Sequence, residues 1–232
     1  MKTTTPSYQR HRFPSVIISH AIWLSHRFCL SFRDIEELLD ERGITVTYET
    51  WQKWRQKFGP AYSRTLKKRQ ARLSDTGHID EVFVTIQGER HYLYRVVDQD
   101  GDAIDILGQR RCNQLTAERF FSRLFKGQGG EPRWLVRDKL RSYDAAHRTM
   151  MPTVHYLNHV FANNRAEVSH EPTRQRKRHI CGFSSSTQAQ QFLTLHGLTQ
   201  NLFRLRRHLM RAVNYRLLRS QAFQVCQDAV CA

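Results

Sequence analysis

The chain has 232 residues, and its 37 Lys and Arg against 21 Asp and Glu give a formal net charge of +16. This surplus predicts a polyanionic partner. Nucleic acid is the leading candidate, although charge alone does not separate DNA from RNA or from an anionic membrane surface. Because 40% of the residues are hydrophobic, a disordered basic tail is excluded, and the length allows one substantial core with a small accessory domain.

The five cysteines are widely spaced and contain no C-x-x-C pair. They predict neither a disulfide framework nor a zinc ribbon, and they fit a reducing cytoplasm. Near the N-terminus, the apolar stretch over residues 16–24 is short and is interrupted by Ser19 and His20. We therefore expect neither a signal peptide nor a membrane span.

Residues 1–73 are predicted to form a small all-α domain followed by a linker. Apolar residues recur at helical spacing over residues 14–26. A second helix begins at Ser31, which has a capping-box pattern with Asp34 in the position usually held by Glu. The boundary to the next domain is expected near Leu73.

The third predicted helix, Tyr48 to Phe58, follows a turn at Gly43 and has an exposed basic side. A helix, a glycine-containing turn and a second helix predict a helix-turn-helix motif, and a plain three-helix bundle with a solvated basic face is the alternative. If the motif binds DNA, the residues expected to meet phosphates are Lys53, Arg55 and Lys57. Residues 59–76 contain Gly, Pro and a basic run and are predicted to be a linker.

From residue 78 onward, the apolar periodicity changes from that of a helix to that of a strand. Three strands joined by hairpin turns precede a helix and two further strands. The predicted elements are the strands His78–Ile86, Arg90–Val97 and Ala103–Leu107, a helix over Asn113–Phe125, and the strands Trp134–Val136 and Val154–Val160. Helices are also predicted over residues 164–178 and, with a basic character, over about 187–220.

The order of these elements predicts an α/β fold with a mixed sheet. The three meander strands pair antiparallel, and the helical crossover brings the fourth strand in parallel beside the first. This order is ribonuclease H-like. The predicted domains are a helix-turn-helix domain with its linker at 1–73, a ribonuclease H-like catalytic domain at 74–185 and a basic helical segment at 186–232.

Three carboxylates are expected to meet at one end of this sheet. Asp80 lies inside the first strand, where a carboxylate without compensation is costly. Asp138 directly follows the fourth strand, at the end where α/β sheets place ligands, and Glu167 lies at the start of a helix. Such a set can hold two Mg²⁺ or Mn²⁺ ions about 3.5 to 4 Å apart. Each residue alone is weak support, and the prediction rests on their combination with the strand order.

Arg174 shares a helix face with Glu167 if the helix continues past Pro172, and there it can pair with a phosphate near the metal ions. For Arg178, on the same face, a solvated charged position is the preferred interpretation.

Two other patterns resemble metal sites and are interpreted as structural. The acidic run Asp98 to Asp105 has its glycine at the wrong place for a calcium loop, so a hairpin turn is predicted. His155 and His159 have a ligand-like gap, but that spacing serves a site only on a helix, and no Cys pair completes a zinc site.

The blocks HIDEVF, DKLRSY and NNRAE, which begin at residues 78, 138 and 163, together resemble the insertion-sequence transposases of family six. Three separated blocks in this order are a specific signal, and the similarity spans nearly the whole chain. The resemblance implies that Asp80, Asp138 and Glu167 form the Asp-Asp-Glu triad of the family and that Arg174 is its basic residue seven positions after the Glu.

By this resemblance, the chain is expected to cleave DNA at the terminal inverted repeats of its element and to join the freed 3′ hydroxyls to target DNA. Cointegrates formed by replicative transposition would be the typical product. The resemblance also implies that a helix-turn-helix at about residues 31–58 binds the repeats, that the chain forms a homo-oligomer, and that it acts at the nucleoid in the bacterial cytoplasm.

Two positions depart from the family pattern: Gly77 stands where Trp is frequent, and Arg137 stands where Thr is frequent. A positive Arg137 beside Asp138 competes with a metal ion for that carboxylate. The alternative from another class is therefore a non-catalytic DNA-binding protein, including a decayed transposase that still occupies the repeats. A ribonuclease H-like nuclease without strand joining is a third interpretation.

Overall fold

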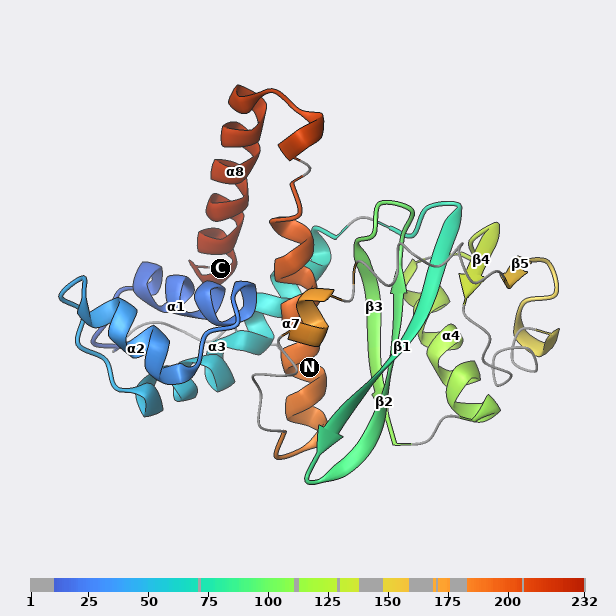
Figure 1. The fold of residues 1–232 in the computed structure, drawn as a ribbon, viewed down its shortest axis with the longest axis horizontal. Coiled ribbons are helices and arrows are strands. Elements are labelled where there is room, and N and C mark those ends of the chain that lie inside the picture. Colours follow the sequence, from blue (N-terminus) through green and yellow to red (C-terminus); the bar gives the residue numbers. More distant parts are fainter. Residues whose placement is uncertain are drawn as a thin grey trace. The chain divides into compact units, whose positions relative to one another are not determined.

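The computed structural model describes residues 11–70, 72–110, 113–128, 130–137, 148–158, 169, 171–175, 183–205 and 207–231. The chain divides into two compact units, which we call the helical unit (residues 1–70 with 194–232) and the sheet unit (residues 71–193) (Figure 1).

The helical unit contains α1 (Ser15–Arg27), α2 (Phe32–Asp40), α3 (Tyr48–Lys68), the second half of α7 (Ser186–Leu202) and α8 (Ala212–Cys231). The predicted capping box at the start of α2 is confirmed, because Ser31 Oγ accepts the N–H of Asp34 and the Asp34 carboxylate accepts the N–H of Ser31. Gly43, at a φ of +72°, lies in the turn that follows α2. None of the helices in the described ranges is long and apolar enough to cross a membrane.

The third helix is longer than predicted. α3 continues across the Gly-Pro pair at 59–60 to Lys68, so the predicted linker at 59–76 is wrong for its first half. Pro60 lacks a backbone N–H, and a proline costs about 3 kcal/mol in a helix interior. Buried side chains recur every four residues along this part of the helix, at Phe58, Tyr62 and Leu66. Their burial contributes roughly 1.5 to 3 kcal/mol each, which outweighs the cost of the proline.

The C-terminal helix completes the core of the helical unit. Phe223, Cys226 and Ala229 of α8 belong to the same apolar cluster as the side chains of α1 and α3. The ring centroid of Phe223 lies 5.0 Å from that of Trp23. The second half of α8 is therefore packed against the N-terminal helices, whereas Val213 and Leu217 in its first half are exposed.

This packing differs from the predicted division, in which residues 186–232 form a separate segment. α7 contributes to both units, with Phe192 in a core of the sheet unit and Leu198 in the core of the helical unit. The helix predicted over about 187–220 is also interrupted, since α7 ends at Leu202 and a short 3₁₀ helix (Arg207–Leu209) precedes α8.

The sheet unit contains a five-stranded sheet with the order β3-β2-β1-β4-β5. Its strands are β1 (Thr76–Ile86), β2 (Glu89–Val97), β3 (Ala103–Gln109), β4 (Trp134–Arg137) and β5 (His155–Asn158), and α4 (Gln114–Gln128) lies between β3 and β4 in the chain. β2 pairs antiparallel with β1 and β3, whereas β4 pairs parallel with β1 and β5. The predicted mixed sheet is confirmed, as are the antiparallel meander and the parallel place of β4 beside β1.

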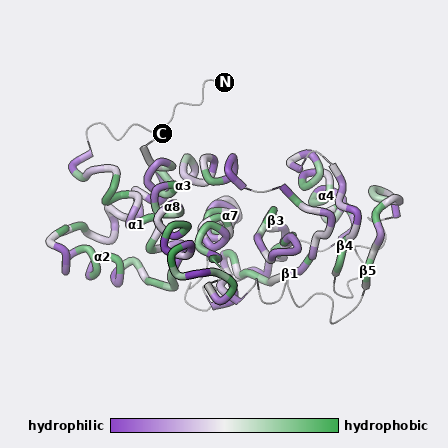
Figure 2. The backbone as a smooth tube through the Cα atoms, turned by 90° about the horizontal axis from the view of Figure 1, so that it is seen from above, coloured by the Kyte–Doolittle hydropathy of each residue, from purple (hydrophilic) through white to green (hydrophobic). Residues whose placement is uncertain are grey.

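Each face of the sheet carries its own apolar core. On one face, Ile79, Tyr94 and Leu135 pack with side chains of α4, and on the other, Val84 and Ile106 pack with the first half of α7. Figure 2 shows hydrophilic and hydrophobic residues alternating along α4, as expected for a helix with one face on a sheet.

Gly77 is buried within β1, where the space around it is already filled. A Cβ at this position would lie 3.3 Å from Leu135 Cδ1, 3.4 Å from Leu73 Cδ1 and 3.5 Å from Val96 Cγ1. The departure from the Trp that is frequent in the family therefore has a packing reason in this chain, because its neighbours occupy the volume of a larger side chain.

We expect Gly77→Trp to lower the free energy of unfolding by about 2 kcal/mol or more, because an indole at this position overpacks the core and forces its neighbours off their rotamers. Urea denaturation measures the change. Thr85→Trp, at an exposed position of the same strand, is the matched control. Equal denaturation midpoints for the two variants would contradict the packing around Gly77.

The position of α8 has a chemical test. Burial raises the pKa of the Cys226 thiol to about 11, against a hydrogen bond with Tyr62 that lowers it. At pH 8 only roughly one thiol in a thousand is then the reactive thiolate. We expect iodoacetamide at pH 8 to leave Cys226 unmodified in the folded chain and to modify it in urea, as read by peptide mass mapping. Modification of half-buried Cys29 in the same sample is the control that the reagent is active. Equal rates at Cys226 in buffer and in urea would contradict the packing of the second half of α8.

Candidate active site

Asp80 lies on β1, the middle strand of the sheet. The residue is half-buried, and Oδ1 accepts the N–H of Glu81 at 2.7 Å. Ile79 beside it is fully buried in the core under α4. Since successive side chains of a strand point to opposite faces, Asp80 lies on the other face, the one that carries Val84.

The fourth strand runs parallel to β1 and ends beside Asp80. In the register of this pair, Ile79 lies opposite Arg137, the last residue of β4. Asp138 lies outside the described residues, but it is bonded to Arg137, and successive Cα atoms are about 3.8 Å apart. Asp138 therefore directly follows the last residue of β4 in the chain, and its place beside Asp80 stays a prediction.

Glu167 also lies outside the described residues, whereas Ser169, two positions later, is described and is 1% exposed. The Arg95 guanidinium donates to the backbone oxygen and to Oγ of Ser169, at 2.7 Å in each case. Arg95 lies directly across from Asp80 in the register of β1 and β2, so the two side chains share a face of the sheet. Ser169 is thus anchored to the face that bears Asp80.

Arg95 is the candidate functional residue that the sequence analysis did not single out. It is 2% exposed, although it is charged. Burying a charged group is costly unless hydrogen bonds compensate, so such a position needs dedicated partners. An arginine within the otherwise apolar run LYRVV of β2 was the available signal.

The predicted phosphate contact, Arg174, is exposed and lies in the helical residues 171–175. Pro172 is within this stretch and does not interrupt it. His170 and Arg178 lie outside the described residues, so a common helix face with Glu167 stays a prediction.

Two patterns were interpreted as structural in the sequence: the acidic run Asp98 to Asp105, and the pair His155 and His159. Asp98 Oδ1 accepts the N–H of Asp100 at 2.8 Å, which caps the turn between β2 and β3 and confirms the predicted hairpin. The ring of His155 stacks on that of Trp134, with centroids 4.6 Å apart. His159 lies outside the described residues.

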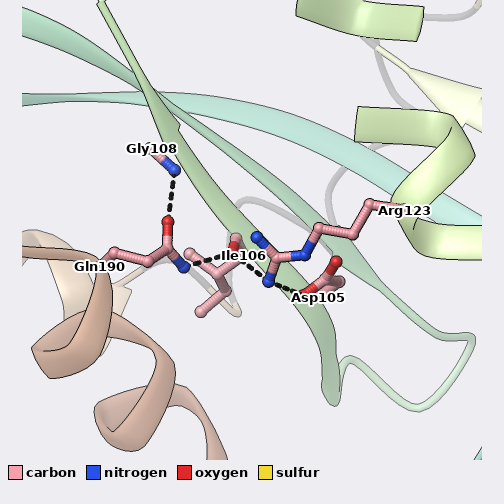
Figure 3. A network of polar contacts seen from close by, with 5 residues as sticks. All are labelled: Asp105, Ile106, Gly108, Arg123 and Gln190. Atoms are coloured by element: carbon pink, nitrogen blue, oxygen red, sulfur yellow. Dashed lines mark hydrogen bonds and ion pairs between the residues drawn. The ribbon is translucent and has the colours of Figure 1, made fainter. Parts of the chain in front are cut away.

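The edge of the sheet near this site is fixed by a polar network (Figure 3). β3 is an edge strand, and the outward backbone groups of such a strand need partners. Gln190 of α7 accepts the N–H of Gly108 at 2.8 Å and donates to the carbonyl oxygen of Ile106 at 2.6 Å. From α4, Arg123 donates to Asp105 Oδ1 at 2.8 Å. Both helices are therefore held to β3, two strands from Asp80.

The third helix carries the predicted DNA contacts. Lys53 and Lys57 are exposed and one turn apart, so they share a helix face. Arg55 is half-buried, and its guanidinium carbon lies 5.0 Å from the centroid of the Phe32 ring. The buried side of the same helix is occupied by Trp51 and Trp54.

The donor chemistry of the three predicted ligands fits a divalent metal ion, because carboxylate oxygens are hard ligands. Within the described ranges, no group of three or more His, Cys, Asp or Glu is arranged to hold a metal ion. Asp138 and Glu167 are not in those ranges, so the arrangement of the three ligands remains a proposal based on Asp80 and its neighbours.

Comparison with known proteins gives the family. The family model of a DDE domain matches residues 74–206. The transposase for the insertion sequence-like element IS431mec of Staphylococcus aureus is 31% identical over 178 residues, which cover 74% of this chain and 79% of that protein. The transposase for insertion sequence element IS257 in transposon Tn4003, also from Staphylococcus aureus, is 30% identical with the same coverage.

Distant similarity to solved structures is also found. The catalytic core domain of HTLV-2 integrase in complex with magnesium has a TM-score of 0.40 at 10% identity, over 62% of this chain and 94% of that one. The Mos1 transposase catalytic domain has a TM-score of 0.37 at 12% identity, over 75% and 94% of the two chains. From the match of the DDE domain and the identity with the two staphylococcal proteins, the chain belongs to the DDE transposases of insertion-sequence family six, the enzymes of DNA transposition.

Proposed function

We propose that this transposase cleaves DNA at the terminal inverted repeats of its element and joins the freed 3′ hydroxyls to target DNA by metal-dependent phosphoryl transfer. The parallel register of β1 and β4, with Ile79 opposite Arg137, supports this most strongly. In the chain, Asp80 directly follows Ile79 and Asp138 directly follows Arg137. The two aspartates are therefore attached to paired residues of neighbouring strands.

The proposed metal ligands are Asp80, Asp138 and Glu167. When bound, two Mg²⁺ ions would activate the attacking oxygen and stabilise the leaving oxygen, and Mn²⁺ can take their place. The Asp80 side chain lies on a face of the sheet, and its strand, β1, pairs with β2 on one side and with β4 on the other. Arg174, exposed on its helix, is proposed to pair with a DNA phosphate beside the ions.

The helical unit is proposed to bind the terminal repeats, with α2 and α3 as a helix-turn-helix. The exposed side chains of Lys53 and Lys57 support this assignment, as does the net charge of +16. Half-buried Arg55 retains a phosphate contact in this proposal, with its guanidinium group over the ring of Phe32. Because both ends of an element have to be joined, we propose that the chain acts as a homo-oligomer.

Strand transfer tests the catalytic proposal. With Mg²⁺, we expect the wild type to join a labelled duplex carrying the terminal repeat to target DNA. Asp80→Asn and Asp138→Asn should each lower the yield of joined product more than about a hundredfold, because an amide does not supply the anionic oxygen that a metal ion requires. Asp75→Asn, at an exposed position just before β1, is the matched control and should retain activity.

The products separate the three interpretations of the chain. Joined product from the wild type and Asp75→Asn, but not from Asp80→Asn or Asp138→Asn, supports the transposase. Cleaved but unjoined DNA would indicate a nuclease. Tight binding of the repeat without any product from the wild type would indicate a DNA-binding protein that has lost catalysis.

The salt dependence of repeat binding tests the role of α3. We expect Lys53→Ala and Lys57→Ala each to reduce the slope of log K against log salt concentration by about one unit, because each removes one phosphate contact. Arg55→Ala should do the same and also lower stability, since it uncovers the ring of Phe32. Lys126→Ala, an exposed position on α4, is the control with the same change of charge. A slope that stays the same for all three α3 variants would refute the assignment.

A further inference from the structure

We propose that Arg95 is a positioning residue for the metal site: it ties Ser169, two residues after Glu167, to the sheet face that bears Asp80. The inference rests on the proposed function, because it takes Asp80 and Glu167 to bind the same ions. Arg95 acts through Ser169, and no contact between Arg95 and a metal ion or DNA is part of the proposal.

The hydrogen bonds of Ser169 join three parts of the sheet unit. Two neighbouring N–H groups of Arg95, on Nη1 and Nη2, donate to the backbone oxygen and to Oγ of Ser169 at 2.7 Å each. Ser169 Oγ in turn donates to the carbonyl oxygen of Gly101 at 2.7 Å. At 2% and 1% exposure, Arg95 and Ser169 have little contact with water, so water competes weakly for these bonds.

The turn that receives the Ser169 hydroxyl is itself fixed. Gly101 has a φ of +83°, a left-handed conformation that glycine adopts without strain. Asp98 Oδ1 accepts the N–H groups of Asp100 and Asp102 at 2.8 and 2.9 Å. The carbonyl of Gly101 is therefore held by a capped turn, and Ser169 is fixed to that turn as well as to β2.

The register of the sheet connects this anchor to the candidate site. Asp80 lies directly across from Arg95, and directly opposed residues of antiparallel strands have Cβ atoms about 4.5 to 5.5 Å apart. Glu167 is two residues before Ser169 in the chain. In this proposal, the anchor on Ser169 is what keeps Glu167 close to the Asp80 face.

The geometry of the anchor requires an arginine. The planar guanidinium presents two parallel N–H groups, which match the two oxygens of one serine. A lysine carries its donors on a single nitrogen and does not reproduce this fork. If Arg95 had a purely structural role, any substitution that preserves packing would leave metal binding unchanged. If Arg95 positions the metal site, losing the two parallel donors weakens metal binding even when packing is preserved.

The test measures Mn²⁺ binding to the full chain by calorimetry, together with the Mg²⁺ concentration that gives half-maximal strand transfer. We expect Ser169→Ala, which keeps the backbone oxygen and loses the hydroxyl, to weaken Mn²⁺ binding about tenfold and to raise the required Mg²⁺ concentration similarly, because supporting residues of a metal site typically contribute tenfold to a hundredfold in affinity. Arg95→Lys should have a larger effect, and Arg95→Met the largest. Binding of the terminal repeat without metal should not change.

Thr173→Ala is the matched control, since Thr173 is 5% exposed in the same segment and its removal leaves the bonds between Arg95 and Ser169 in place. Its Mn²⁺ affinity should equal that of the wild type. If Arg95→Met does not fold, Ser169→Ala still decides the matter.

Three results would overturn the inference in distinguishable ways. A wild type that binds no Mn²⁺ refutes the proposed function itself. Wild-type affinity in both Ser169→Ala and Arg95→Lys refutes the positioning role while leaving the metal site in place. Equal loss of affinity in Ser169→Ala and Thr173→Ala shows that the segment needs only intact packing, and that Arg95 is structural.

Discussion

The parallel pairing of β4 with β1 is the constraint on which the candidate site depends. β4 has only four residues, and its last one lies opposite Ile79, the residue before Asp80. Parallel neighbours require a crossover, which in this chain contains α4. The buried rings of Phe120 and Phe121 hold α4 to the sheet face opposite Asp80. A purely apolar core on one face thus leaves the other face of β1 available for chemistry.

That other face changes character along a single strand. Near its end, Val84 and Ile86 pack with the first half of α7, whereas four residues earlier the same face presents Asp80. The polar part is not left to water, because Arg95 and Ser169 are both nearly inaccessible and hydrogen-bonded to each other. Polar groups in such an environment have few alternative partners, which favours one arrangement of the segment over many.

The helical unit shows the same dependence on distant parts of the chain. α3, which carries the proposed DNA contacts, shares its core with α1 and with the end of the chain through α8. Around Trp23, the rings of Phe28, Phe203 and Phe223 lie 5.0 to 5.6 Å away, in edge-on or tilted contacts. The presentation of Lys53 and Lys57 on the outer side of α3 therefore rests on residues close to the C-terminus.

Local signals in the sequence were enough to predict the strands, the hairpins, the capping box at Ser31 and the position of Asp80 on the first strand. Each of these depends on side-chain period or turn chemistry within about ten residues. The continuation of α3 past Pro60, the packing of the second half of α8 and the bond between Arg95 and Ser169 were not predictable in this way. Arg95 and Ser169 are 74 positions apart, and a contact over that separation leaves no periodic pattern, because burial and hydrogen bonding between distant residues exist only once the sheet has brought them together.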